Sequence, residues 1–214
     1  GTSISFGSEA VFENSSTSDK AAVFDAANEK IVIAYRNDGN SDKGTAVVGT
    51  VSGTSISFGT PVVFETGAVV NNSPSAAYDS SNEKVVISYA DQGNSSYGTA
   101  IVGTVSGTSI SFGTAVVFES ASTNYTAAVY DSSASKVVIA YRDGGNSGQG
   151  TAVVGTVSGT SISFGSATVF NDGNTAYTST TFDSTNNKVV ITYTDSANSS
   201  HGTAVVGTVS GTSI

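Results

Sequence analysis

Short apolar runs separated by polar residues and glycine recur along the whole chain. In one stretch the runs are residues 127–130, 136–141, 150–157 and 161–164, and the last continues into 168–170. Each run is rich in Val, Ile, Thr, Tyr and Phe and is bounded by Gly, Asn, Asp or Ser, which is typical of a β-strand. The spacing of an amphipathic helix is missing. The pattern therefore predicts four short strands in succession.

This group of strands is repeated. The string Gly-Thr-Ser-Ile-Ser-Phe-Gly begins at Gly1, Gly53, Gly107 and Gly159, and its first four residues return at Gly211. A repeat of about 50 residues with four strands is typical of one blade of a β-propeller. We therefore expect an all-β chain that folds as one domain over residues 1–214. The expected architecture is a four-bladed β-propeller with four antiparallel strands per blade.

The phase of the repeat predicts how this propeller closes. The chain starts in a fourth strand, residues 4–12, and its last third strand is residues 204–206. We expect the N-terminal strand to pair beside that third strand, complete the last blade and remove its free edge. This arrangement favours a monomer. Residues 211–214 duplicate the start of the fourth strand, so assembly of two chains into a larger ring is the alternative.

Composition and charge exclude several classes of protein and site. The 214 residues include 8 Lys and Arg against 17 Asp and Glu, which gives a net charge of −9, and Cys, Met, Trp and Leu are absent. Without Cys there is no disulfide framework and no thiolate metal site. A strongly negative chain repels phosphate backbones, so nucleic acid is not an expected partner. No apolar run approaches the ~20 residues of a membrane-spanning helix, so no membrane partner is expected.

The repeats differ mainly in two sets of loops. These loops join the second strand to the third and the fourth strand to the next repeat, so they lie on one face of a propeller. Loops that vary on a rigid scaffold are where ligands are commonly bound. We expect this face to be the contact surface. The candidate binding residues on it are Arg36, Asp91, Tyr97, Tyr125, Arg142, Asp143, Tyr177 and His201.

The aromatic and basic candidates suit particular ligands. An exposed tyrosine offers a flat apolar face and a hydroxyl, which fits a sugar or a peptide. Arg36 and Arg142 are the two arginines of the chain and occupy equivalent positions in the first and third repeats. A guanidinium there would bind a carboxylate or sulfate group. The alternative is that each arginine pairs with a neighbouring aspartate.

Metal binding is a weaker interpretation of the same loops. Asp91 with Asn94, or Asp143 with Asn146, offers oxygen ligands of the kind Ca²⁺ prefers. A turn in which Asp and Asn bond to their own backbone explains the motif better. His201 has no second His or Cys with which to anchor zinc. We expect no cofactor and no metal.

Catalysis has little support in the sequence. There is one histidine and no Gly-x-Ser-x-Gly motif, so a Ser-His triad is not expected. Glycoside hydrolysis needs two carboxyl groups, and nothing in the sequence selects two of the available ones. We therefore expect that the chain is not an enzyme. The aspartates considered for such a pair are Asp19, Asp38, Asp91, Asp143, Asp172 and Asp195.

The motif Ala-Ala-Tyr-Asp-Ser-Ser-Asn-Glu-Lys-Val-Val-Ile of residues 76–87, together with residues 145–165, resembles the near-identical propeller repeats of marine phage and bacterial surface proteins. The resemblance implies a recently amplified repeat used for display or adhesion. It leads us to expect a non-catalytic binding or adhesion module, with a glycan as candidate ligand, outside the cell or on a virion surface. The alternatives are a structural, excised or engineered repeat scaffold without a ligand, and a glycoside hydrolase.

Overall fold

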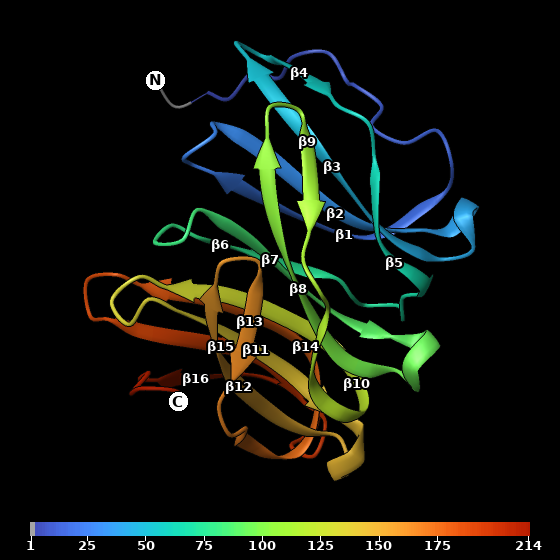
Figure 1. Cartoon of the computed structure of the whole chain (residues 1–214). Coiled ribbons are helices and arrows are strands. Elements are labelled where there is room, and N and C mark those ends of the chain that lie inside the picture. The colour runs from blue at the N-terminus through green and yellow to red at the C-terminus, as the bar shows by residue number, and fades with distance from the viewer. Residues whose placement is uncertain (1–2) are drawn as a thin grey trace.

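The computed structural model describes residues 3–214 and is built almost entirely of antiparallel strands (Figure 1). This confirms the expected all-β class. The helical elements of the described residues are three short 3-10 turns: η1 (Asp38–Asn40), η2 (Gln92–Asn94) and η3 (Gly144–Asn146). No helix in this part of the chain has the length and apolarity needed to cross a membrane.

Strand pairing joins the described strands into two sheets, of five and eleven strands, which we divide into four units of consecutive strands. Unit 1 contains β1 (Thr17–Asp25), β2 (Lys30–Asn37), β3 (Lys43–Ser52), β4 (Ser55–Phe58) and β5 (Val62–Ala68). Unit 2 contains β6 (Ser75–Asp79), β7 (Lys84–Asp91), β8 (Tyr97–Ser106), β9 (Ser109–Phe112) and the first half of β10 (Val116–Asp131). Unit 3 contains the second half of β10, β11 (Lys136–Asp143), β12 (Gln149–Ser158), β13 (Ser161–Phe164) and the first half of β14 (Thr168–Asp183). Unit 4 contains the rest of β14, β15 (Lys188–Asp195) and β16 (His201–Gly207).

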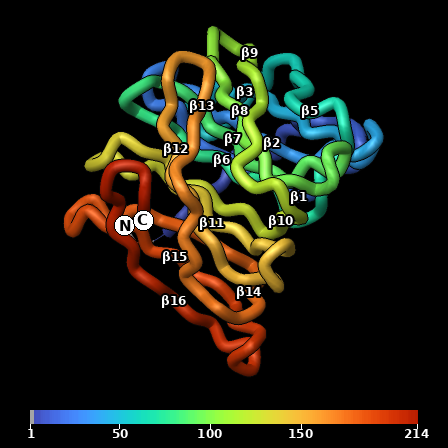
Figure 2. Tube along the Cα trace, turned by 60° about the horizontal axis from the view of Figure 1, so that its bottom comes forward, coloured from blue at the N-terminus to red at the C-terminus, as the bar shows by residue number. Residues whose placement is uncertain are grey.

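Within a unit, each strand pairs with its neighbour in the chain. The outermost strand is broken in two, because β4 pairs with one end of β3 while β5 pairs with the other end. The same division separates β9 from β10 and β13 from β14. Figure 2 shows the β8–β9 and β12–β13 hairpins projecting together from one end of the molecule. Since β10 crosses from unit 2 into unit 3 and β14 from unit 3 into unit 4, these three units are joined by continuous strands, whereas β5 ends before unit 2 begins.

A glycine and an aromatic ring connect each unit to the next. Gly98 of β8 lies under the ring of Phe118, and a Cβ on this glycine would come within 2.4 Å of that ring. The ring also packs against Tyr141 at 5.1 Å and Phe164 at 5.6 Å between centroids, and both belong to the following unit. Phe64 lies over Gly44 in the same way, and Phe170 over Gly150. The absence of a side chain in the third strand therefore lets the outer strand reach the next unit.

The hydrophobic core lies between units. Three clusters of Val, Ile and Ala side chains fill the successive junctions. Tyr35, Tyr89 and Tyr141 at the ends of the second strands are fully buried. Their hydroxyls donate hydrogen bonds, each 3.0 Å long, to a glutamate of the preceding outer strand or segment. Burial raises the pKa of all three phenols.

The aspartates that open the first hairpin of each unit cap the turns that follow them. Asp79 Oδ1 accepts hydrogen bonds from the backbone N–H groups of Ser81 and Asn82. Its other oxygen accepts from the Asn82 side chain at 2.8 Å. Asp25, Asp131 and Asp183 also accept hydrogen bonds within their own turns. These carboxylates stabilise local turns and are therefore not part of a shared acidic site.

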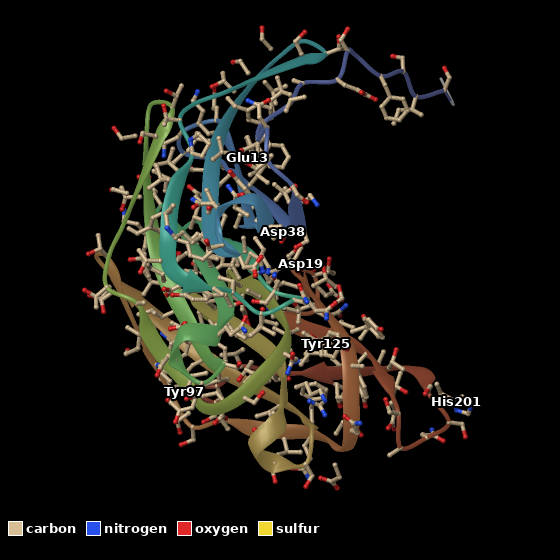
Figure 3. All side chains as sticks on the ribbon, turned by 90° about the vertical axis from the view of Figure 1, so that its right-hand side faces the viewer. Glu13, Asp19, Asp38, Tyr97, Tyr125 and His201 are labelled. Atoms are coloured by element: carbon tan, nitrogen blue, oxygen red, sulfur yellow. The ribbon has the colours of Figure 1, made fainter. Side chains whose placement is uncertain are left out.

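The predicted closure of the ring was wrong. Residues 3–16, which we call the N-terminal segment, form no strand, and the outer edge of β16 has no partner among the described residues. The segment packs on unit 1 instead, where Phe12 contacts Tyr35 and Phe58. Figure 3 shows why: the units follow an open arc, with this segment at one end and His201 at the other. Within residues 3–214, units 1 to 3 each have four strands when the broken outer strand is counted once, and unit 4 has three.

Two glycines at equivalent positions test this open edge. Gly98→Ala would push a methyl group into the Phe118 ring, whereas Gly202→Ala meets nothing within 4 Å. We expect Gly98→Ala to lower the free energy of unfolding by about 1–3 kcal/mol, the usual cost of overpacking. Gly202→Ala is expected to change it by less than about 1 kcal/mol. Denaturant unfolding in dilute solution measures both, and equal losses would show that the β16 edge is covered.

Candidate functional site

In three units, the innermost strand has a β-bulge at the same position. The pairing of β10 with β11 shifts between Asn124 and Ala127, and the bulged residue Tyr125 has a φ of 52°. Tyr177 of β14 and Asp19 of β1 occupy the same bulged position with positive φ. A bulge re-aims the side chain that it carries. Figure 3 shows Asp19 and Tyr125 on the concave side of the arc.

Three of the candidate residues meet around one cavity. Tyr125 and Tyr177 pack with their ring centroids 4.9 Å apart, and Arg142 lies beside them. The cavity has a volume of about 400 Å³ and is also lined by polar side chains of Asn124, Asn174, Thr175 and Ser196. Burial and the neighbouring Tyr177 raise the pKa of Tyr125, and the charge of Arg142 opposes this shift. Tyr177 keeps 68% of its surface exposed, so a ligand can reach the ring pair.

Arg142 differs from its counterpart Arg36 in its acidic partners. The guanidinium of Arg36 contacts Asp38 at 2.5 Å and Asp42 at 2.7 Å. The alternative that an arginine pairs with neighbouring aspartates thus holds for Arg36. Glycines occupy both of these acidic positions around Arg142, which donates from Nε to the side-chain oxygen of Asn174 at 2.8 Å. No carboxylate lies within 4.0 Å of the Arg142 guanidinium among residues 3–214, so it can take an anionic group.

A pair of carboxyl groups lies at the junction of units 1 and 2. Glu65 accepts hydrogen bonds from the Tyr89 hydroxyl at 3.0 Å and from the backbone N–H of Gly67 at 2.7 Å. Asp91 accepts one from the N–H of Asn94 at 3.1 Å. A Cβ on Gly67 would lie 3.3 Å from a Glu65 oxygen and 3.5 Å from an Asp91 oxygen, which limits the separation of the two oxygens to about 7 Å.

The two members of this pair differ in electrostatic environment. Burial raises the pKa of Asp91, and the negative charge of Glu65 raises it further, while backbone hydrogen bonds from Asn94 and Gly93 act in the opposite direction. A carboxyl group with a raised pKa beside a second carboxylate is a common arrangement for acid–base work. Sequence reasoning missed Glu65. The available signal was a glutamate at the same position in the first three repeats.

Glycines distinguish this junction from its three equivalents, all of which lie within the described residues. Gly67 and Gly93 face each other here, so neither side contributes a side chain. At each other junction, a glycine faces a residue whose Cβ fills the space: Gly39 faces Ser15, Gly145 faces Ala121, and Gly173 faces Ala197. The Glu65–Asp91 pair therefore has more room beside it than the equivalent Glu119–Asp143 pair.

Asp143 and His201 do not join either site, and Tyr97 meets the carboxyl pair only as the strand partner of Asp91. Asp143 accepts hydrogen bonds from the N–H groups of Gly145 and Asn146, as the turn interpretation predicts. Tyr97 begins β8, paired with Asp91 on one side and Ser122 on the other, and His201 begins β16 in an exposed position. Within residues 3–214, no three His, Cys, Asp or Glu side chains come together to hold a metal ion.

No family model matches the chain, and no curated protein matches it. Among solved structures, it is similar to an exo-β-1,3-galactanase from Phanerochaete chrysosporium with β-1,3-galactotriose, with a TM-score of 0.54 and 9% sequence identity. The match covers 83% of this chain and 42% of the enzyme chain. The chain therefore spans less than half of that enzyme, and at this identity the likeness establishes the fold.

The expectation of a non-catalytic binding or adhesion module was wrong on this comparison. The fold that matches belongs to a galactanase, which is an enzyme. The same finding weighs against the expectation that the chain is not an enzyme. It favours the glycoside hydrolase alternative. The sequence alone did not select two carboxyl groups for that reaction. The resemblance to phage and bacterial surface repeats, and the expected location, stay predictions.

The raised pKa of Asp91 predicts a pH-dependent effect on stability. Because this pKa lies above its usual 3.8, the folded state loses stability as the pH rises and Asp91 ionises. Asp91→Asn is expected to raise the melting temperature at neutral pH, and the gain should shrink in acid, where Asp91 is neutral in both states. Thermal unfolding followed by circular dichroism across pH measures this.

A control with the opposite sign is available on the surface. Hydrogen bonds from the Asn186 side chain and nearby backbone lower the pKa of Asp183, so its contribution to stability is present at neutral pH and is lost in acid. Asp183→Asn is therefore expected to lower the melting temperature at neutral pH. A lower melting temperature for Asp91→Asn at neutral pH would contradict the inference that the ionised Asp91 carboxylate destabilises the folded state.

Proposed function

We propose that this chain hydrolyses glycosidic bonds and that Glu65 and Asp91 are its carboxyl pair. The observation that carries the proposal is the coincidence, at one junction out of four, of two close carboxyl groups with two facing glycines. The raised pKa of Asp91 and the similarity of the fold to a galactanase support it. Asp91 and Glu65 also lie on the face with the variable loops, where ligands are commonly bound.

The environments suggest separate roles for the two groups. Asp91, whose pKa is raised, is the member of the pair suited to donate a proton to the glycosidic oxygen as the bond to the anomeric carbon breaks. Glu65 accepts hydrogen bonds from the Tyr89 hydroxyl and the Gly67 N–H, which fix its position for attack on the anomeric carbon. It would either take a proton from the attacking water or attack the anomeric carbon itself. A separation of up to about 7 Å is compatible with both mechanisms.

The tyrosine cavity would hold another part of the same substrate. Aromatic faces pack against the apolar faces of sugar rings, and Tyr125 and Tyr177 present such faces side by side. The Arg142 guanidinium, free of acidic partners, favours a sugar that carries a carboxylate or sulfate group at this position. Because the net charge of the chain is −9, its overall field repels anions, so an anionic sugar would bind only near a cationic group such as Arg142.

Matched variants of two equivalent glutamates test the proposal. Glu65→Gln removes the proposed base or nucleophile, and we expect it to lower kcat on β-1,3-galactan oligosaccharides by about 100-fold or more. Glu119→Gln is the control, since Glu119 accepts the same tyrosine hydrogen bond but lies beside Ala121. It should leave kcat within about twofold. Reducing-end release measured by chromatography gives both rates.

A third variant separates the glycines from the carboxyl groups. Gly67→Ala adds a methyl group 3.3 Å from Glu65 and 3.4 Å from the Gly93 backbone, which reproduces the crowding of the other junctions. The fold should persist and kcat should fall by about tenfold or more, because small misplacements at a reacting centre are costly. Absence of turnover in the unmodified chain on neutral and acidic glycans, or equal rates for Glu65→Gln and Glu119→Gln, would refute the proposal.

A further inference from the structure

The two arginines occupy equivalent positions, but their guanidinium groups differ in how many of their donors are used. All three nitrogens of the Arg36 guanidinium have partners, which are Ser18, Asp38, Asp42 and the carbonyl of Val69. Arg142 donates from Nε to Asn174, and within residues 3–214 its two terminal nitrogens donate to no acceptor. Arg36 is therefore saturated, whereas Arg142 keeps two nitrogens available for a ligand.

One glycine accounts for much of this difference. Gly148 stands where unit 1 has Asp42, and both residues have a left-handed backbone, with φ of 78° and 63°. A Cβ on Gly148 would come within 2.7 Å of a terminal nitrogen of Arg142, so the guanidinium lies directly over bare backbone. The carboxylate that completes the pairing of one arginine is thus missing beside the other.

The walls of the cavity beside Arg142 add neutral hydrogen-bond donors. Asn174 accepts from Arg142 through its side-chain oxygen, so its amide nitrogen is left to donate. The side chains of Asn124 and Ser196 also line this cavity of about 400 Å³, and none of the described residues that line it is acidic. A cation, neutral donors and two aromatic rings together suit a sugar that carries a negatively charged group.

The cavity and the carboxyl pair lie at different junctions. Glu65 and Asp91 meet between units 1 and 2, whereas the cavity is lined by Arg142 of unit 3 and by residues of unit 4. Figure 3 shows Tyr97, the strand partner of Asp91, well apart from Tyr125 of the cavity. Packed sheets are about 10 Å apart, so sites separated by two junctions are on the order of 20 Å apart along the arc. A single sugar cannot contact both sites, whereas a chain of sugars can.

We propose that the substrate is an anionic polysaccharide whose carboxylate or sulfate group binds Arg142 while a bond further along the same chain lies at the carboxyl pair. This inference rests on the proposed function, because it takes the reaction at Glu65 and Asp91 as given and adds which chains are cut. The charge is recognised several sugars away from the bond that breaks. Discrimination therefore depends on chain length, and a chain too short to reach Arg142 gains nothing from its acidic group.

Substrates that differ only in charge and length test this proposal. β-1,3-Galactan oligosaccharides of graded length are prepared unmodified, or with one carboxylate or one sulfate on the sugar at either end. On long chains we expect one end-labelled acidic form to raise kcat/KM by about tenfold or more over the neutral chain, as a charge-assisted contact should. The form that gains more identifies the anion and the end that Arg142 binds. The shortest chains should show no gain.

A matched pair of variants assigns the preference to Arg142. Gly148→Asp supplies the carboxylate that Asp42 supplies to Arg36, at a backbone conformation that Asp42 already adopts, so the variant should fold. It should abolish the preference for acidic chains and leave kcat/KM on neutral chains within about twofold. Gly148→Asn adds a side chain of nearly the same size without charge, and it should keep the preference.

Binding measurements separate this inference from the proposed function. Calorimetry on Glu65→Gln, with and without Gly148→Asp, gives the affinity for the longest acidic chain in the absence of turnover. If Gly148→Asp weakens that binding by about tenfold while the unmodified protein hydrolyses no glycan, the cavity binds the anion and the proposed function fails. Equal kcat/KM on acidic and neutral long chains, or a preference that survives Gly148→Asp, would overturn the inference and leave the hydrolysis standing. A preference already present in the shortest chains would also overturn it, because the acidic group would then bind beside the carboxyl pair.

Discussion

The structure depends on one interlock between a glycine and two aromatic rings. Gly98 has no side chain, so Phe118 can lie flat over β8 and still reach Tyr141 in the following unit. Aromatic pairs of this kind contribute about 0.5–1.5 kcal/mol beyond the area they bury. A single unit cannot bury both of its faces, so stability resides in these junctions, as in other repeat proteins.

The interlock also explains why carboxyl pairs occur where they do. The glutamate that follows the phenylalanine lies over the end of the next unit's second strand. There the tyrosine hydroxyl donates a hydrogen bond to its carboxylate. The aspartate that ends that strand is then close by. Stability requires one glycine at the crossing of the two loops, because a second Cβ would clash. The junction of Glu65 and Asp91 has two glycines, so it lacks the Cβ atom that fills the equivalent position at the other junctions.

The sequence predicted the strands well because their signals are local. The run 136–141 became β11 (Lys136–Asp143) and the run 150–157 became β12 (Gln149–Ser158). The sites were harder to predict. Glu65 of β5 and Asp91 of β7 belong to different sheet units, and they come together only when those units pack. Tyr125 and Tyr177 were identified as candidates, but their contact depends on two bulges that sequence patterns do not specify. Ring closure failed as a prediction because the angle between units arises from packing across whole junctions.

The N-terminal segment shows that an available edge, more than intrinsic propensity, decides where strands form here. The residues Ile-Ser-Phe occur at 4–6, 56–58, 110–112 and 162–164. They form β4, β9 and β13 where a third strand lies alongside, and no strand where none does. Strand preference measures the fit to neighbouring strands, so an unpaired copy of a strand-forming sequence retains its preference unsatisfied.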